Sequence, residues 1–253
     1  MLGPLKHSTV TVAESQVSEA ALSELLFTDS LRLQHPGGHR GLPPCAGPGF
    51  LWPCVNLLER TAAGFLLLAL IPFFLAIAFI VFALSGRSPF VAHRRVGRNG
   101  RELWVLKFRT MWDAAGSEVP KPIFVERISC GSESSRKNSS DPRVTSAFAA
   151  LCRRYSIDEL PQLWHVLRGD MALIGPRPLT SEELLRFYRS DAARLLVVRP
   201  GLSGLWQVNG RSKLTLEERR RLDIFMLENW SLKLYMQILQ ATVPCVLSGR
   251  DAW

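Results

Sequence analysis

A run of 23 uncharged residues, 62–84, constrains this chain more than any other feature. It reads AAGFLLLALIPFFLAIAFIVFAL. As a helix rising about 1.5 Å per residue it would extend about 35 Å, enough to cross a hydrocarbon core of about 30 Å. The run is too long for a signal peptide and begins too far from the N-terminus. We therefore predict a membrane helix within residues 53–86.

Pro72 stands near the middle of this run and is the predicted break in the membrane helix. A proline removes an intrahelical hydrogen bond and kinks or breaks a helix. Two shapes follow: a kinked helix that spans the membrane, or a helix–break–helix that enters and leaves by the same face. Glu59 and Arg60 precede the run and nearly cancel each other's charge, so we expect them to favour neither shape.

The charge is concentrated after the apolar run. Residues 1–60 carry four basic and five acidic side chains, whereas the rest of the chain carries 27 basic and 17 acidic ones. Basic residues flank cytoplasmic ends of membrane helices, so we expect the C-terminal part in the cytoplasm. The same charges suit anionic headgroups or phosphorylated substrates. The sequence shows no helix-turn-helix, zinc-ligand spacing or RNP signature, and we expect no nucleic-acid partner.

Three regions follow from composition. Residues 1–52 form an N-terminal extension, with a helix expected over 12–33 and a Gly/Pro-rich linker over 34–53. Residues 53–86 form the membrane helix, and 87–253 form one cytosolic domain. The five cysteines contain no CxxC pair, and we assign them no role.

A strand is expected over residues 102–111, ELWVLKFRTM. Side chains alternate along a strand, which places Val105, Lys107 and Arg109 on one face. The opposite face would carry Trp104, Leu106 and Phe108. Two cations at one strand end indicate either a solvated edge or an anion site, and the strand alone does not separate these alternatives.

The stretch 156–178 reads SIDELPQLWHVLRGDMALIGPRP and contains adjacent carboxylates, Asp158 and Glu159. Pro161 has no N–H and fits the first turn of a helix, which would make Asp158 the N-cap and end the helix near Arg168. A cap of this kind contributes about 1 kcal/mol, and the neighbouring glutamate would complement the helix dipole. Taken alone, this purely structural interpretation is favoured.

Arg177 shifts the balance, because it stands between Pro176 and Pro178. The second proline forces the arginine into an extended conformation, and such a guanidinium can grip a carboxylate or phosphate bidentately. An acid pair among cations can hold Mg²⁺, which prefers oxygen ligands, or one acid can attack phosphorus and form an acyl-phosphate. Other cations of neighbouring segments are Lys107, Arg109, Arg143, Arg153 and Arg154.

Three motifs together resemble the bacterial sugar transferase family, the monotopic phosphoglycosyl transferases. They are KFRTM at 107–111, DELPQLWHVLRGDMALIGPRP at 158–178 and RPGLSGLWQVNGRS at 199–212. The resemblance covers roughly residues 53–253. The break reads Ser-Pro in small members of the family and Ile-Pro here.

The resemblance implies a transfer of sugar-1-phosphate from a UDP-sugar to polyprenyl (undecaprenyl) phosphate, with release of UMP and with Mg²⁺ as cofactor. Asp158 would be the nucleophile, and Glu159 would serve the metal or proton transfer. We expect an α+β, mainly helical domain on the cytoplasmic face of the bacterial inner membrane, attached by a re-entrant helix and interfacial amphipathic helices. A homodimer is left open. The alternative is a membrane-bound scaffold or nucleic-acid-binding protein without catalysis.

Further residues are assigned to phosphate or substrate binding. Arg211 follows an Asn-Gly turn, and Asp223 resembles an acidic position of the family. Asp223 lies in a helix expected over 215–230, whose Arg219–Arg221 could face anionic lipid. Trp206 is expected in the core and His165 in a structural role. The complete predicted binding set is Lys107, Arg109, Arg143, Arg177, Arg211 and Asp223.

Overall fold

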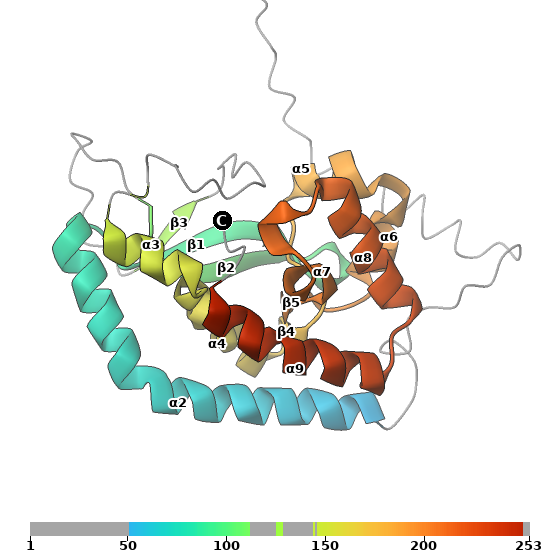
Figure 1. The fold of residues 1–253 in the computed structure, drawn as a ribbon, viewed down its shortest axis with the longest axis horizontal. Helices are drawn as coiled ribbons and strands as arrows, with labels where there is room; N and C mark the ends of the chain where they lie inside the picture. The colour runs from blue at the N-terminus through green and yellow to red at the C-terminus, as the bar shows by residue number, and fades with distance from the viewer. Residues whose placement is uncertain (1–50, 112–124, 129–143, 145, 250–253) are drawn as a thin grey trace, which may run out of the picture.

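The computed structural model describes residues 51–111, 125–128, 144 and 146–249. Within these ranges the chain is mainly helical with two small sheets, as the α+β prediction requires (Figure 1). The expected helix over 12–33 and the candidate residue Arg143 lie outside the described residues.

The larger sheet has the strand order β2-β1-β3. β1 (Phe90–Val96) pairs antiparallel with β2 (Glu102–Phe108) and parallel with β3 (Val125–Ile128). The strand expected over 102–111 is therefore present but ends at Phe108. Its alternation is confirmed, because Leu103, Val105 and Lys107 are buried whereas the residues between them are half-buried.

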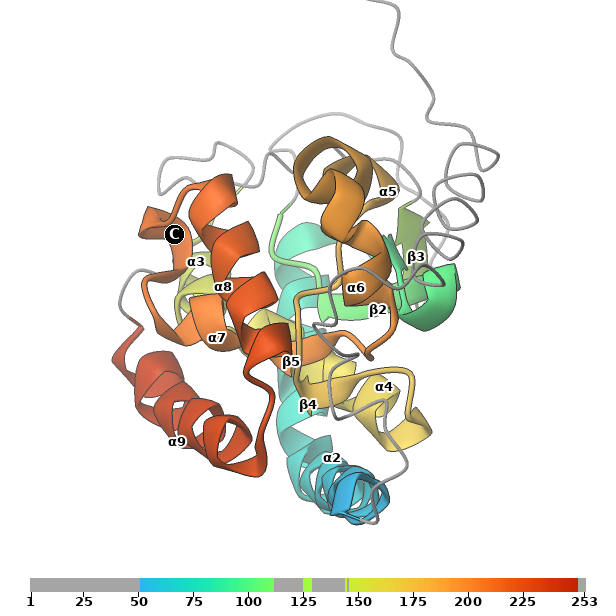
Figure 2. The same ribbon diagram turned by 90° about the vertical axis from the view of Figure 1, so that its right-hand side faces the viewer.

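The smaller sheet pairs β4 (Ala172–Ile174) in parallel with β5 (Gly201–Ser203). Figure 2 shows this pair at the centre of the molecule, between the helices α7 and α9 on one side and α4 on the other. The remaining helical segments are η2 (Arg98–Gly100), α3 (Ala147–Arg154), η3 (Ile157–Gln162), α4 (Leu163–Arg168), α5 (Ser181–Glu183), η4 (Leu184–Tyr188), η5 (Arg189–Asp191), α6 (Ala192–Leu196), α7 (Leu205–Val208), η6 (Arg211–Lys213), α8 (Leu216–Glu228) and α9 (Leu232–Ser248).

The apolar run lies within a single long helix, α2 (Leu51–Ser85), which contains Pro72. Figure 1 shows one sharp bend in α2, which a proline explains because it removes a hydrogen bond and crowds the preceding turn. The helix bends at this point without being interrupted. It is the one helix of the described part of the chain that is long and apolar enough to cross a membrane.

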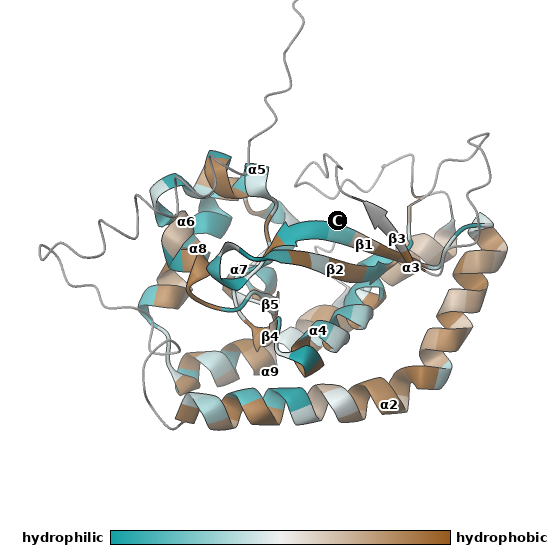
Figure 3. Ribbon diagram, turned by 180° about the vertical axis from the view of Figure 1, so that it is seen from behind, coloured by the Kyte–Doolittle hydropathy of each residue, from teal (hydrophilic) through white to brown (hydrophobic). Residues whose placement is uncertain are grey.

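Both limbs of α2 pack on the domain that follows it, and each shares a buried cluster with residues of β2. In the first limb, Ala63 joins a buried cluster with Leu103 and Val105 of β2. In the second limb, Ile77 and Val81 join a cluster with Phe108 of β2. Figure 3 shows polar residues mixed into the first limb and an almost wholly apolar second limb. The outward side of α2 remains exposed and apolar.

The helix expected over 215–230 is confirmed as α8, which begins after a capping box between Thr215 and Glu218. The expectation that its arginines face lipid is wrong for Arg219, which is buried over the Trp206 ring at 4.7 Å. Arg220 and Arg221 form ion pairs with Glu217, and Arg220 also pairs with Asp191. An exposed apolar surface is found on α9 instead, formed by Leu232, Met236, Val243 and Leu247.

Candidate active site

The acid pair lies on η3, which begins after Ser156. Ser156 adopts a left-handed conformation with φ 55°, so the chain turns sharply before Asp158. The prediction that Asp158 is the N-cap is therefore wrong, because the cap position belongs to Ser156 and Asp158 lies inside the first turn. Pro161 lies one turn later than expected, while the end of the following helix at Arg168 is confirmed.

Arg211 supports this turn from the other side. Its Nη2 donates to Ser156 Oγ at 2.8 Å, and its Nη1 donates to the Cys245 carbonyl oxygen of α9 at 3.5 Å. Arg211 also has a left-handed backbone, with φ 48°. The residue predicted to contact phosphate thus lies beside the turn that presents Asp158, and its phosphate-binding role stays a prediction.

Glu159 brings two of the predicted cations together. Its Oε1 lies 3.4 Å from Lys107 Nζ and 3.3 Å from Arg177 Nη1. Asp158, Glu159 and Lys107 are all buried, and Asp158 is only 3% exposed. Two other chain segments therefore converge on the acid pair, which is a much more specific arrangement than a helix cap.

Two glycines explain why Arg177 reaches this position. The Gly175 nitrogen donates to Ser203 O at 2.9 Å, and the Gly201 nitrogen donates to Pro176 O at 2.8 Å. A Cβ on Gly175 would lie 2.7 Å from Arg199 O and 2.8 Å from the Gly201 nitrogen, closer than real Cβ contacts come. Only glycine lets the two backbones approach so closely, and their contact fixes the turn that carries Arg177.

Arg109 is buried next to the same strand end. Its Nε donates to Ser88 O at 2.7 Å, and its backbone nitrogen donates to Pro89 O at 2.9 Å. Lys107 and Arg109 are respectively 8% and 5% exposed. The solvated-edge alternative is therefore wrong, and a binding role for Arg109 stays a prediction.

His165 has the structural role that was expected. Its Nε2 accepts the Leu106 backbone N–H at 3.2 Å, which ties α4 to the strand that carries Lys107. Burial lowers the pKa of His165, partly offset by Asp170. The neutral imidazole can accept this bond, so the contact requires the unprotonated ring. Nothing in the sequence identified Leu106 as its partner.

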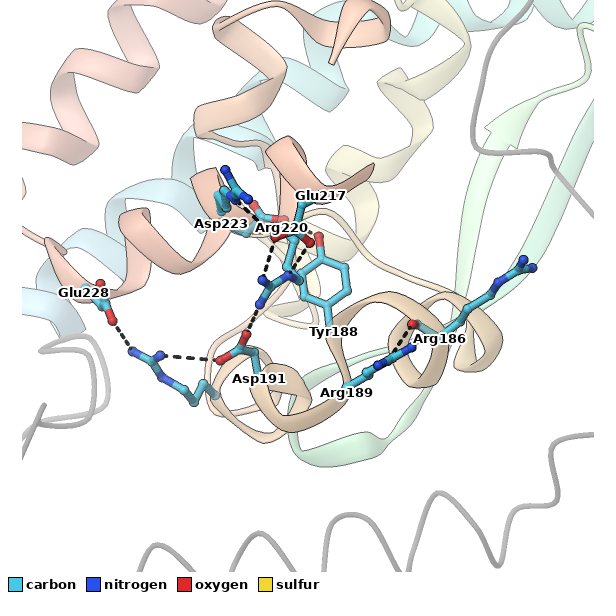
Figure 4. Close-up of polar contacts among 10 residues, drawn as sticks. Arg186, Tyr188, Arg189, Asp191, Glu217, Arg220, Asp223 and Glu228 are labelled. Carbon is cyan, nitrogen blue, oxygen red and sulfur yellow. Dashed lines mark hydrogen bonds and ion pairs between the residues drawn. The ribbon is translucent and has the colours of Figure 1, made fainter. Parts of the chain in front are cut away.

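Asp223 lies in a different environment from the acid pair. It is fully buried, and the Tyr188 hydroxyl donates to its Oδ2 at 2.7 Å (Figure 4). Burial raises the pKa of Asp223 to about 7, against the opposing effects of Tyr188 and Arg219. The structure gives Asp223 a packing partner that sequence reasoning missed, and its predicted contact with substrate stays untested.

The arrangement at Glu159 suits chemistry on a phosphorylated molecule. Cations from two segments face a buried carboxylate, and a second carboxylate lies next to it in the chain. Such cations can neutralise the charge of a phosphoryl group, and a carboxylate can attack phosphorus once that charge is offset. A purely structural acid pair would not need two cations from distant segments, Lys107 buried and Arg177 half-buried.

Comparison with known proteins gives a consistent result. A family model described as bacterial sugar transferase matches residues 52–249. The exopolysaccharide production protein ExoY of Rhizobium meliloti (strain 1021) is 41% identical over 211 residues, which cover 81% of this chain and 92% of that protein.

Two longer relatives match over most of this chain. The undecaprenyl-phosphate galactose phosphotransferase of Salmonella typhimurium is 40% identical over 171 residues, covering 67% of this chain and 35% of that protein. The UDP-glucose:undecaprenyl-phosphate glucose-1-phosphate transferase of Xanthomonas campestris pv. campestris is 33% identical over 210 residues, covering 78% of this chain and 39% of that protein. The chain therefore belongs to the bacterial sugar transferase family.

Proposed function

We propose that the protein transfers sugar-1-phosphate from a UDP-sugar to undecaprenyl phosphate and releases UMP, as an early membrane step of exopolysaccharide assembly. The observation that carries this proposal is the convergence of Lys107 and Arg177 on Glu159 beside buried Asp158. The acceptor is inferred from the names of the Salmonella and Xanthomonas relatives, and the UDP-sugar donor from the name of the Xanthomonas relative.

In the first half-reaction a carboxylate oxygen of Asp158 attacks the phosphorus next to the sugar. A bond forms between that carboxylate oxygen and the phosphorus, which gives an acyl-phosphate, and the bond from the phosphorus to the bridging oxygen breaks. UMP leaves with the bridging oxygen, so charge balances without a proton. Lys107 and Arg177 offset the negative charge on the phosphoryl oxygens during this exchange.

In the second half-reaction a phosphate oxygen of undecaprenyl phosphate attacks the same phosphorus. The bond to Asp158 breaks, the carboxylate returns to its starting form, and the product is an undecaprenyl diphosphate sugar. A water-soluble donor and a lipid acceptor then need not share the site at one time. One set of cations serves both anions in turn, which favours a ping-pong sequence.

Mg²⁺ belongs to the proposal as a cofactor. The described residues contain no group of three or more acidic, histidine or cysteine ligands. Mg²⁺ nevertheless needs only one or two carboxylates when substrate phosphates and waters complete its shell, which Asp158 and Glu159 can satisfy. When bound, the ion would neutralise phosphate charge; the protein's own part is to hold the two carboxylates side by side.

We also propose that α2 is re-entrant at the cytoplasmic face of the bacterial inner membrane. Each limb of α2 shares a buried cluster with residues of β2, the first limb through Ala63 and the second through Ile77. A straight spanning helix could not keep both contacts with a domain on one side of the membrane. The exposed apolar side of α2 and the exposed residues of α9 would face lipid.

UMP release tests the proposal. Purified protein in lipid is incubated with undecaprenyl phosphate and, one at a time, a panel of UDP-sugars. We expect UMP release with a subset of donors and a matching lipid-linked product. A protein that binds membranes or nucleic acid without releasing UMP from any donor would support the scaffold alternative instead.

A further inference from the structure

A buried polar cluster joins the first limb of α2 to the catalytic domain. Glu59 Oε1 accepts the Leu173 backbone N–H at 2.9 Å and the Tyr235 hydroxyl at 2.8 Å. Glu59 Oε2 lies 3.0 Å from Arg199 Nη2, which also donates to Asn56 Oδ1. We call Asn56, Glu59, Arg199 and Tyr235 the α2 anchor.

The anchor brings together residues that are far apart in the chain. Arg199 follows α6 and its Nη1 donates to Met171 O at 3.3 Å, so the arginine is held from both sides. Glu59 is 3% and Tyr235 6% exposed. Trp52 adds an aromatic contact, with its ring centroid 6.3 Å from that of Tyr235. The first limb is thus bound to β4 and α9 by charge, hydrogen bonds and packing.

This arrangement corrects the expectation that Glu59 and Arg60 cancel each other at the membrane flank. Glu59 points its charge to Arg199, whereas Arg60 Nε donates to the Leu167 carbonyl oxygen at 2.9 Å. Each flanking charge therefore has its own partner in the domain. The residues that precede the apolar run therefore favour one topology of α2 over the other.

A spanning helix would separate the anchor. Glu59 would move to the opposite side of the membrane, leaving Arg199, the Tyr235 hydroxyl and the Leu173 N–H without the carboxylate that they now share. Buried polar groups and charges that lose their partners are strongly unfavourable. Pro72 permits the return of the chain by bending α2, but a bend alone does not select the side on which the first limb ends.

We propose that the α2 anchor selects the re-entrant topology, by holding the first limb on the side of the catalytic domain. The residues act as positioning residues and do not touch substrate. This inference rests on the re-entrant topology of the proposed function. On this proposal the ion pair of Glu59 and Arg199 determines the topology of α2. The hydropathy of the run 62–84 does not determine it, because that run would equally allow a spanning helix.

The native cysteines provide the test. Cys45 and Cys54 precede the apolar run, and the others follow it. In spheroplasts a membrane-impermeant maleimide should leave the re-entrant wild-type chain unlabelled, and detergent should expose Cys45. In Arg199→Met, which leaves the sequence of α2 unchanged, we expect labelling of Cys45 to rise severalfold. Cys45→Ser in the same background identifies the labelled site.

Two controls separate the anchor from general damage. Arg194→Met makes the same substitution in an arginine that pairs with Glu228, and we expect no label. Leu184→Ala removes a buried side chain from a cluster that contains no α2 residue, and it reports the effect of destabilisation alone. Tyr235→Phe removes one anchor hydrogen bond without changing charge, and we expect a smaller rise than in Arg199→Met.

The outcomes are distinct. Unchanged labelling in both Arg199→Met and Tyr235→Phe, with the protein present in the membrane, would overturn the anchor. Equal labelling in Leu184→Ala would assign the effect to unfolding and overturn it too. Labelled wild-type protein would overturn the re-entrant topology itself. Because labelling does not depend on turnover, a failed UMP assay with the expected labelling pattern would reject the enzymatic proposal and retain the anchor.

Discussion

Two of the regions that bury a carboxylate surround it with opposite kinds of partner. At the candidate active site, Glu159 faces the cations Lys107 and Arg177, each more than 3.2 Å away. In the region between η4 and α8, Asp223 faces the hydroxyl of Tyr188 at 2.7 Å (Figure 4). The first arrangement can receive an anion between its cations. In the second, the neutral Tyr188 hydroxyl binds Asp223 Oδ2, and Asp223 Oδ1 has no hydrogen-bond partner among the described residues.

The surroundings of the two acids differ in the same way. Around Asp223, the remaining charges pair with each other across the helices: Asp191 binds Arg220 and Arg194, and Arg194 also binds Glu228 at 3.1 Å. These pairs hold η5 and α6 against α8 and need no outside ligand. Burial alone therefore does not distinguish Glu159 from Asp223, whereas the type of partner does.

The largest expected effect comes from Asp158→Asn. The substitution keeps the size of the side chain but removes the nucleophile, so we expect UMP release to fall on the order of 1,000-fold or more. Asp191→Asn is the matched control, and we expect its turnover to stay within about twofold of wild type. Comparable losses in both variants would erase the distinction between the two regions.

Arg177→Lys should have the next largest effect. Lysine keeps the charge but lacks the planar fork of the guanidinium, so we expect kcat/KM to fall about 10- to 100-fold. Arg194→Lys, in the other region, is the control. If the two variants behave alike in a UMP-release assay, the guanidinium of Arg177 has no special role.

Asp223→Asn should change the pH dependence of stability. Burial raises the pKa of Asp223 from 3.8 to about 7, so the folded wild type binds a proton that the unfolded chain has lost in this window. The stability that this group contributes is fully present below the unfolded-state pKa of 3.8. It is lost as the pH rises to the folded-state pKa of about 7. Asparagine does not titrate, so the Tm of the variant relative to wild type should rise between about pH 4 and about pH 7 and then level off. A difference in Tm between variant and wild type that does not change with pH would contradict the raised pKa of Asp223.

The smallest expected effect on stability is that of Asp191→Asn. Its partners Arg194 and Arg220 are partly exposed, with side-chain exposures of 31% and 27%. Pairs of this kind contribute less than about 1 kcal/mol. We expect Tm to fall by a few degrees at most, measured by thermal unfolding, and the loss to shrink at high salt. A much larger fall in Tm would show that the ion pairs of Asp191 contribute more to stability than exposed pairs do.

Local sequence patterns predicted the elements better than the contacts between them. The apolar run, the bend at Pro72 and the helix that ends before Gly169 follow from hydropathy and from backbone chemistry of single residues. The cap at Ser156 was missed because its left-handed backbone, φ 55°, is unusual for serine and leaves no local pattern.

The candidate site could be predicted only in part for a similar reason. The stiff turn at Arg177 could be predicted from its flanking prolines. The contact of Arg177 with Glu159, however, depends on the close approach of Gly175 and Gly201. The partner of Glu59 lies 140 residues away at Arg199. Nothing in the local sequence distinguishes such a long-range pair from a solvated flank.

The covalent step is the central claim, and a reaction without acceptor tests it most directly. Purified protein is mixed with a radiolabelled UDP-sugar in the absence of undecaprenyl phosphate, then denatured and digested with trypsin. The account predicts about one equivalent of UMP per active enzyme and a sugar-phosphate adduct on the peptide 155–168, which contains Asp158, with no adduct in Asp158→Asn. UMP that appears only when undecaprenyl phosphate is present, together with unlabelled protein, would contradict the account and indicate direct transfer in a ternary complex.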